Sequence, residues 1–258
     1  MQYEIKQQDK FKFIEEGSGE PLVLLHGLFG ALSNFRDLIE YFRAHYKVVV
    51  PILPLYELDL LHTTVGGLEK YVHKFIELRD YKNLHVLGNS LGGHVALVHV
   101  LKHPERIKSI TLTGSSGLFE SGMGSTYPKR GDYEYIKKQT ELTFYDPKTA
   151  TKELVDEVYG IVNNRMKALK IISLAKSAIR NNLGEELNQI KQPTLLIWGN
   201  NDTITPPFVG KEFQRMIPGS ELHLIDKCGH APMMEVPDEF NKILHGFLKK
   251  LNEPAAVA

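Results

Sequence analysis

The sequence has little cysteine and no excess of charge of either sign. The single cysteine, Cys228, excludes an internal disulfide framework and suits a reducing compartment. The 31 Lys and Arg residues balance the 31 Asp and Glu residues, which gives a formal net charge of zero. A balanced surface gives no electrostatic reason to expect nucleic acid or an anionic membrane as a partner, and we expect neither.

Long apolar runs are also missing. No stretch of the 258 residues approaches the ~20 apolar residues that a membrane span requires. The first residues, MQYEIKQQDKFKF, lack the apolar segment of a signal peptide. We therefore expect a cytoplasmic protein, and the composition says nothing about its oligomeric state.

Short apolar runs are present, and they alternate with segments of helical periodicity. Six runs have the continuous character of strands buried on both faces: 21–27, 47–53, 83–89, 106–114, 193–200 and 221–226. Helices are predicted at 33–44, 68–78, 91–101, 208–216 and 237–251. Alternating character at 3–7 and 11–15 predicts a hairpin before them. The order of elements predicts an α/β fold with a mostly parallel central sheet flanked by helices.

The alternation is interrupted between the fourth and fifth apolar runs. Residues 115–132 are rich in Gly and Ser, and 133–187 have helical character without a buried strand. We predict a core formed by 1–117 and 189–258, with an inserted helical cap at 118–188. Ligands of open parallel sheets bind beyond the carboxyl ends of the strands. A cap that leaves from such an end is placed to cover the site.

Residues 88–92 match the pattern G-x-S-x-G, with Ser90 at its centre. The pattern lies between a predicted strand and a predicted helix, where a sharp turn strains the central residue and tolerates only small neighbours two positions away. One interpretation is a serine that caps a helix between structural glycines. The strand before and the helix after favour the other interpretation, in which Ser90 is a nucleophile.

An acyl-transfer site also needs donors for the oxygen that gains charge. The backbone N–H of Leu91, which follows the nucleophile, is one candidate. The second is expected in the loop His26-Gly27-Leu28-Phe29-Gly30 after an early strand. We predict that Leu28 supplies it, with Phe29 as the alternative. His26 is expected to hold this loop rather than to transfer protons.

The acid and base of a serine nucleophile are expected at the carboxyl ends of later strands. Asp202 follows the strand predicted at 193–200, and His230 follows the one at 221–226. We predict that His230 takes the Ser90 proton and that Asp202 orients the imidazole. Asp226 is the rival acid, although its place at a strand end close to His230 favours a turn. The remaining alternative is that these are polar surface loops without a shared role.

Three further features suggest other chemistry. His99 and His103 stand four apart on a predicted helix, as a metal pair would. They have no evident third ligand, so we expect surface residues and no metal site. Ser115 and Ser116 follow no elbow, and we expect them to line a pocket. Cys228 lies near His230, but the elbow at Ser90 argues against a Cys–His pair. No organic cofactor is expected.

The motifs HGLFG, GNSLGG, WGNNDTITP and CGHAP occur in the order and spacing of the α/β-hydrolase superfamily, which the chain resembles over nearly its whole length. The resemblance implies the α/β-hydrolase fold and hydrolase activity. The elbow and the stretch Phe144-Tyr145-Asp146-Pro147 are also similar to the meta-cleavage product hydrolases, which cut a C–C bond in ring-opened aromatic compounds. That resemblance implies that Arg165 meets the carboxylate end of a substrate.

The chain departs from that narrower family at three places. It has Leu28-Phe29-Gly30 where the family favours a Gly- and Pro-rich loop, Ala231 where it favours Trp, and Asn200-Asn201 where it carries a charged pair. We therefore expect a serine hydrolase that acts through an acyl-enzyme on a small or medium apolar small-molecule ester, with Phe29 and Met233 contacting the substrate. Arg165 is the substrate contact that the narrower resemblance implies. The alternatives are C–C hydrolysis of a dienoate, and a binding or signalling protein that turns over slowly or not at all.

Overall fold

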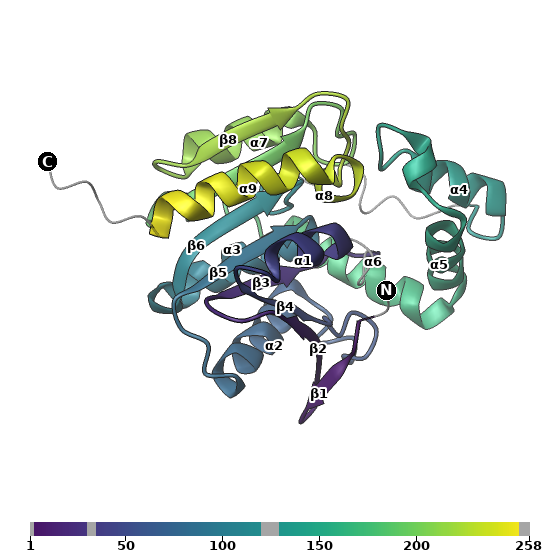
Figure 1. The fold of residues 1–258 in the computed structure, drawn as a ribbon. Coiled ribbons are helices and arrows are strands. Elements are labelled where there is room, and N and C mark those ends of the chain that lie inside the picture. Colours follow the sequence, from purple (N-terminus) through teal and green to yellow (C-terminus); the bar gives the residue numbers. More distant parts are fainter. Residues whose placement is uncertain (1–2, 30–34, 120–128, 253–258) are drawn as a thin grey trace, which may run out of the picture.

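The computed structural model describes residues 3–29, 35–119 and 129–252. Within these ranges eight strands form one sheet in the order β1-β2-β4-β3-β5-β6-β7-β8 (Figure 1). Their bounds are β1 Lys6–Gln8, β2 Phe11–Glu16, β3 Pro21–Leu25, β4 Lys47–Pro51, β5 Leu84–Asn89, β6 Ile107–Thr113, β7 Thr194–Gly199 and β8 Glu221–Ile225. Strands β3 to β8 run parallel, whereas β2 pairs antiparallel with both β1 and β4. The predicted mostly parallel sheet is confirmed.

Helices cover both faces of this sheet (Figure 1). One face carries α1 Arg36–Phe42, α8 Pro232–Glu235 and α9 Pro237–Asn252. The other carries α2 Val65–Leu78, α3 Leu91–Lys102 and α7 Pro207–Met216. Short 3-10 turns lie at η2 Pro104–Arg106, η3 Pro147–Thr149 and η4 Leu187–Gln189. In the described ranges no helix has the length and apolar character needed to span a bilayer.

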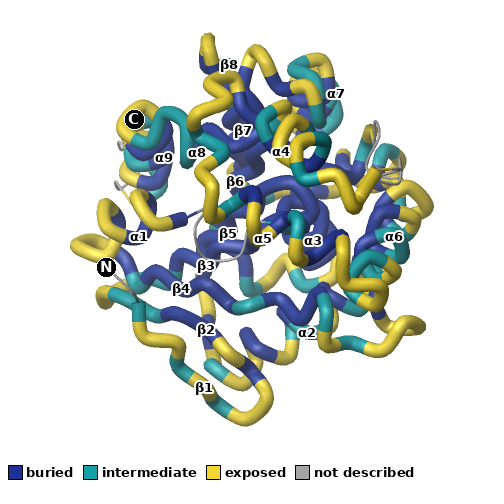
Figure 2. The backbone as a smooth tube through the Cα atoms, turned by 90° about the vertical axis from the view of Figure 1, so that its right-hand side faces the viewer, coloured by how far each residue is buried: buried dark blue, intermediate teal, exposed yellow. Residues whose placement is uncertain are grey.

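The strands are apolar throughout because each of their faces is covered. In β3, Leu22 and Leu24 pack into the core beneath α1 and α9, whereas Val23 and Leu25 pack into the core beneath α2 and α3. Successive side chains of a strand point to opposite faces, so a strand between two helical layers needs an apolar residue at every position. Figure 2 shows these strands buried at the centre and the loops exposed around them.

The connection from β6 to β7 is helical, as predicted for the insertion. It contains α4 Tyr133–Glu141, α5 Lys152–Asn163 and α6 Arg165–Arg180 (Figure 1). Each helix begins after a side-chain cap, from Asp132, Thr151 and Asn164 respectively. A small separate core forms around side chains of α4 and α5. We keep a cap at 118–188 as our proposed division of the chain; residues 120–128 lie outside the described ranges.

Candidate active site

Ser90 joins β5 to α3 in a backbone conformation that serine rarely adopts, with φ 55° and ψ −119°. A non-glycine residue at positive φ costs of order 1–3 kcal/mol and persists only where its surroundings impose it. The end of β6 imposes it here. The Ser90 N–H donates to the Thr113 carbonyl at 3.1 Å, and the Ser90 carbonyl accepts from the Ser116 N–H at 3.2 Å. The predicted strained strand-to-helix turn is present.

The glycines on either side of Ser90 are required by close contacts. A Cβ on Gly88 would lie 2.5 Å from the Gly92 carbonyl oxygen, and a Cβ on Gly92 would lie 2.0 Å from the Leu25 carbonyl oxygen. Neither distance is possible for real atoms. The predicted need for small residues two positions before and after Ser90 is therefore confirmed, and the turn packs directly onto the end of β3.

Asp202 and His230 meet at the ends of β7 and β8. The Nδ1 atom of His230 lies 2.9 Å from Oδ2 of Asp202, and both side chains are buried. Backbone N–H groups of Ile204 and Thr205 donate to Oδ1, and the Thr205 hydroxyl donates to Oδ2. With Nδ1–H donating to the carboxylate, the imidazole presents Nε2 as its basic atom. The rival Asp226 is exposed and accepts from the Asn200 amide in a turn, as expected.

The turn at Ser90 and the His230 loop are in contact. The Asn89 amide donates to the carbonyls of both Thr113 and His230, at 3.1 and 3.3 Å. A Cβ on Gly114 would lie 2.8 Å from Nδ1 of His230. In the described part of the chain the Ser90 hydroxyl makes no hydrogen bond with His230. Nucleophile and base are often further apart before substrate binds.

The candidate oxyanion donors lie on both sides of Ser90. Leu91 begins α3, and the first N–H groups of a helix have no acceptor within it. Gly27 abuts the elbow, since a Cβ there would lie 3.2 Å from Cβ of Ser90. Leu28 is buried and Phe29 is half-buried. The choice between their N–H groups stays a prediction, and Gly30 lies outside the described residues.

His26 holds the loop that carries these donors, as predicted. Its Nδ1 lies 2.9 Å from the Gly27 carbonyl oxygen, and its Nε2 accepts from the Leu53 N–H at 3.0 Å. One ring nitrogen thus donates and the other accepts, which requires a neutral imidazole. Burial lowers the pKa of His26, in agreement with that state.

His94 was missed by the sequence analysis, although it stands in an apolar helical run where a polar side chain needs a partner. It lies one turn after Ser90 on α3 and is completely buried. Its Nε2 donates to the Asn181 carbonyl at the end of α6 at 2.8 Å. Burial lowers the pKa of His94 to about 4. This residue therefore connects the helix that follows Ser90 to the cap.

The cap also contacts the loop of the candidate base. The His230 N–H donates to the carbonyl of Thr143, just after α4, at 2.8 Å. Glu235 accepts from the Gly229 N–H at 2.8 Å through one carboxylate oxygen and from the Tyr145 N–H at 2.7 Å through the other. Burial raises the pKa of the Glu235 carboxyl. A single side chain thus connects the His230 loop with the cap.

Ser115 and Ser116 do not line a pocket, contrary to expectation. Both are fully buried because they pack against the elbow. The Ser116 hydroxyl donates to the Ser90 carbonyl at 3.4 Å, and a Cβ on Gly93 would lie 2.3 Å from the Ser115 hydroxyl oxygen. Cys228 is also buried, and burial raises the pKa of its thiol, which opposes a thiolate role.

The expectation of a surface position is wrong for His99, whereas the side chain of His103 is 25% exposed, and the pair has a third histidine beside it. His99 is 1% exposed because α2 covers it, and His73 of α2 brings a third imidazole to the pair. Sequence spacing could not reveal this residue, since it comes from a different helix.

The predicted substrate contacts lie in different environments. Arg165 is exposed at the first position of α6. Met233 is 1% exposed and packs in the core beneath α1 and α9. Their roles stay predictions.

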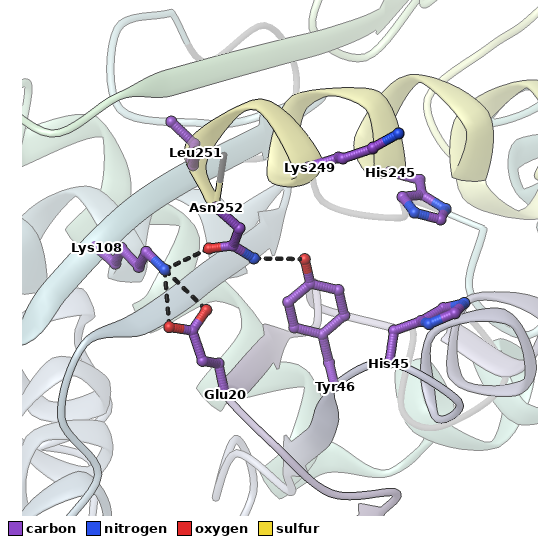
Figure 3. A pocket seen from close by; sticks show the side chains of 8 residues that line it. All are labelled: Glu20, His45, Tyr46, Lys108, His245, Lys249, Leu251 and Asn252. Carbon is purple, nitrogen blue, oxygen red and sulfur yellow. Dashed lines mark hydrogen bonds and ion pairs between the residues drawn. The ribbon is translucent and has the colours of Figure 1, made fainter. Parts of the chain in front are cut away.

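A hollow of about 600 Å³ lies elsewhere, between α9 and the amino ends of the strands. Figure 3 shows its floor, where Lys108 contacts the Glu20 carboxylate and the Asn252 amide, which in turn donates to the Tyr46 hydroxyl. Ser90, Asp202 and His230 follow the carboxyl ends of their strands. The hollow is therefore at the end of the sheet opposite to the candidate catalytic residues, and ligands of parallel sheets bind at the carboxyl end.

Known proteins resemble the chain in sequence and in structure. "Lipase 1" of Psychrobacter immobilis is 27% identical over 90% of this chain and 78% of its own length. The 2-hydroxy-6-oxo-6-phenylhexa-2,4-dienoate hydrolase of Comamonas testosteroni is 26% identical over 95% of both chains. A crystal structure of an alpha/beta hydrolase enzyme from a lagoon-sediment metagenome (Mar Chica, Morocco) has a TM-score of 0.81 and 43% identity, covering 97% of this chain and all of the other.

The family model for the alpha/beta hydrolase family matches residues 22–243. That range contains the elbow, the cap and the loops of Asp202 and His230, and the predicted superfamily resemblance is confirmed. With this match, the sheet order and relatives that are themselves hydrolases and lipases, the chain belongs to the alpha/beta hydrolase family and is a hydrolase.

Proposed function

We propose that the protein is a serine hydrolase in which Ser90 is the nucleophile, His230 the general base and Asp202 the residue that orients it. The hydrogen bond of 2.9 Å between His230 and Asp202, next to a serine held at positive φ, carries the proposal. A buried carboxylate that accepts Nδ1–H fixes the tautomer in which Nε2 can accept a proton from a serine hydroxyl. The strained turn presents that hydroxyl at the amino end of α3.

In this mechanism the Ser90 Oγ attacks a substrate carbonyl carbon while its proton passes to Nε2 of His230. The carbonyl oxygen gains the negative charge and accepts from the N–H groups of Leu91 and Leu28. When the tetrahedral intermediate collapses, His230 returns the proton to the leaving oxygen and an acyl-enzyme remains. Water, deprotonated by His230, then attacks the acyl-enzyme and releases the acid.

We infer carboxylester hydrolysis as the reaction. Leu28 and Leu91 are proposed to offer their N–H groups, while their side chains are buried in the core. The half-buried Phe29 follows Leu28 with an apolar side chain, which favours a small or medium apolar acyl group. The name of the Psychrobacter relative, a lipase, supports the cleavage of an ester bond.

C–C bond hydrolysis of a dienoate is the second candidate, because the Comamonas relative is named for that substrate and aligns over 95% of both chains. In that case Arg165 would bind the carboxylate of the dienoate. The exposed position of Arg165 at the start of α6 allows a guanidinium to reach an anion from the cap. The departures at Leu28-Phe29-Gly30 and Asn200-Asn201 favour the ester reaction.

A fluorophosphonate probe tests the nucleophile. We expect the wild-type protein and the Ser18→Ala control, which alters an exposed serine of a turn, to be labelled. Labelling should disappear in Ser90→Ala and His230→Ala. Well-folded wild-type protein that takes up no label would contradict the proposal and support a binding protein.

Two substrates separate the two reactions. We expect p-nitrophenyl esters of rising chain length to be hydrolysed faster than a ring-fission dienoate. Arg165→Ala should leave short-ester hydrolysis unchanged, as should the control Arg180→Ala at the other end of α6. Efficient dienoate turnover that is lost in Arg165→Ala alone would instead establish C–C hydrolysis.

A further inference from the structure

Three histidines from two helices meet on the face of the sheet covered by α2 and α3. His73 belongs to α2, His99 to α3, and His103 follows α3 directly. One side-chain nitrogen of each lies within 4.8 Å of the others. The rings of His73 and His103 stack, with centroids 3.7 Å apart.

Two nitrogens of this cluster are buried without a hydrogen-bond partner in the described part of the structure: Nε2 of His99 and Nδ1 of His73. The other nitrogen of His99, Nδ1, lies 3.1 Å from Oε1 of Glu69. If Nδ1 carries the proton that it donates to this carboxylate, Nε2 keeps its lone pair. His99 is 1% exposed, and buried polar atoms are nearly always paired. An unpaired buried lone pair beside two other imidazoles is the arrangement of a metal ligand.

We propose that His73, His99 and His103 bind a divalent transition-metal ion of the zinc class. Neutral imidazoles are preferred ligands of such ions, and a carboxylate that accepts the second N–H of a ligating histidine is their usual support. Glu69 occupies that supporting position, and Lys102 holds its other oxygen at 2.8 Å. Three protein ligands leave a fourth tetrahedral position for water.

Binding requires the three nitrogens to approach one another and His103 to rotate out of its stack on His73, because the in-plane lone pairs of two parallel rings cannot point at one ion. Zinc–nitrogen bonds of ~2.0–2.1 Å place tetrahedral ligand atoms about 3.4 Å apart. His103 is the residue with freedom to move, because it lies beyond the last residue of α3 and its side chain is 25% exposed. His99 is already oriented by Glu69.

The ion would be structural rather than catalytic. The 12 residues of α3 lie between Ser90 and His103, which are therefore about 20 Å apart along the helix. A metal held by both helices would link α2 to α3 and would stabilise the folded chain increasingly as the free metal concentration rises above Kd. The site is independent of the proposed hydrolase mechanism.

Zinc titration of the full chain tests the site, with ZnCl₂ competing against a chromophoric chelator and with thermal unfolding as the second measurement. We expect one tight Zn²⁺ per wild-type chain and a higher Tm when it is bound. His73→Gln and His103→Gln should weaken Zn²⁺ binding at least tenfold and remove the rise in Tm. Glu69→Gln should weaken binding by about 10–100-fold. His223→Gln, which changes an exposed histidine of β8, should bind like the wild type.

Equal Zn²⁺ affinity in the wild type, His73→Gln and His103→Gln would overturn the proposal, as would a Tm that Zn²⁺ does not raise in the wild type. The two variants replace partly exposed side chains, so they are expected to fold. Bound Co²⁺ supplies a third readout, since its visible absorption distinguishes tetrahedral nitrogen ligation from the octahedral ion in water.

Discussion

At the scale of single residues, the candidate site combines a serine in a strained backbone conformation with a carboxylate whose two oxygens both accept hydrogen bonds. Ser90 is held at φ 55° by the ends of neighbouring strands, while Asp202 accepts hydrogen bonds from His230, Ile204 and Thr205. The first feature is costly to the fold, and the second restricts how His230 can rotate. Both are expected where a nucleophile and a base must keep their positions before substrate arrives.

The strain at Ser90 predicts that removal of the hydroxyl and relief of the backbone have separable effects. Ser90→Ala and Ser90→Gly should both lower kcat by roughly 10⁴-fold or more. Because glycine adopts positive φ without the Cβ clash, Ser90→Gly should be more stable than Ser90→Ala by about 1 kcal/mol. Urea unfolding measures the difference, and ester hydrolysis measures kcat. Equal stability of the two variants would mean that the turn stores no strain, and a wild-type rate would mean that Ser90 is not the nucleophile.

Substitution of Gly114 tests how precisely the imidazole of His230 must be positioned. A Cβ there would lie 2.8 Å from Nδ1 of His230, at a φ of 50°. We expect Gly114→Ala to displace the imidazole and to lower kcat by about 10²-fold, with a smaller effect on KM. Gly219→Ala is the matched control, since Gly219 also has positive φ (73°) but faces open space. If both variants retain the wild-type kcat, the position of His230 is not critical.

At the scale of elements, the strands could be predicted because they are buried on both faces. Continuous apolar runs such as 21–27 and 83–89 became β3 and β5 at nearly the expected residues. The short helix α8 was missed because its four residues are too few to show a period. The first strand begins only at Lys6, and Ile5 before it is 51% exposed. A hydrophobic pattern predicts a helix or strand where the same packing repeats along the element. It fails where a single turn or the edge of the sheet determines where the element begins or ends.

The lowered pKa of His94 in α3 predicts that the stability of the protein depends on pH. Its folded pKa of about 4 lies below the ordinary value of about 6.5, so between these pH values the unfolded chain binds a proton that the folded chain does not. This stabilisation is complete above pH 6.5 and is lost as the pH falls towards 4. We expect a loss of about 2 kcal/mol at pH 5 from His94 alone. The free energy of unfolding in urea, measured from pH 7 to pH 5, checks it.

His94→Gln is the comparison that isolates this effect. A glutamine amide can donate to the Asn181 carbonyl but does not titrate. Burial also lowers the pKa values of His26 and His85, so part of the acid sensitivity should remain in the variant. The stability of His94→Gln should decline less than that of the wild type over the same pH range. Parallel curves for the two proteins would show that His94 does not contribute.

At the scale of the whole molecule, the sequence could indicate a cap but not its attachment to the core. Residues 133–187 were predicted helical from their own periodicity. The contacts that connect them with the core join distant positions: hydrogen bonds such as Tyr145 with Glu235 and Asn181 with His94, and the packing of α6 side chains into the core beneath α2 and α3. Such pairs leave no local pattern. The positions of Ser90, Asp202 and His230 after β5, β7 and β8 could be predicted because these strands belong to the same parallel sheet, and their shared catalytic role stays a prediction.

Glu235 predicts that the cap and the His230 loop act together. Its two carboxylate oxygens accept from the N–H groups of Gly229, next to His230, and of Tyr145 in the cap. In Glu235→Gln one of these N–H groups would face an amide NH₂ instead of an acceptor, at a cost of about 1–3 kcal/mol. We expect that loss of stability in urea, together with a more than tenfold lower kcat on short esters as His230 loses its position.

Glu212→Gln, on an exposed side chain paired with Arg215, should change neither value. An unchanged kcat in a destabilised Glu235→Gln would assign the bridge to stability alone, whereas a parallel loss would mean that contact with the cap also sets the geometry of His230.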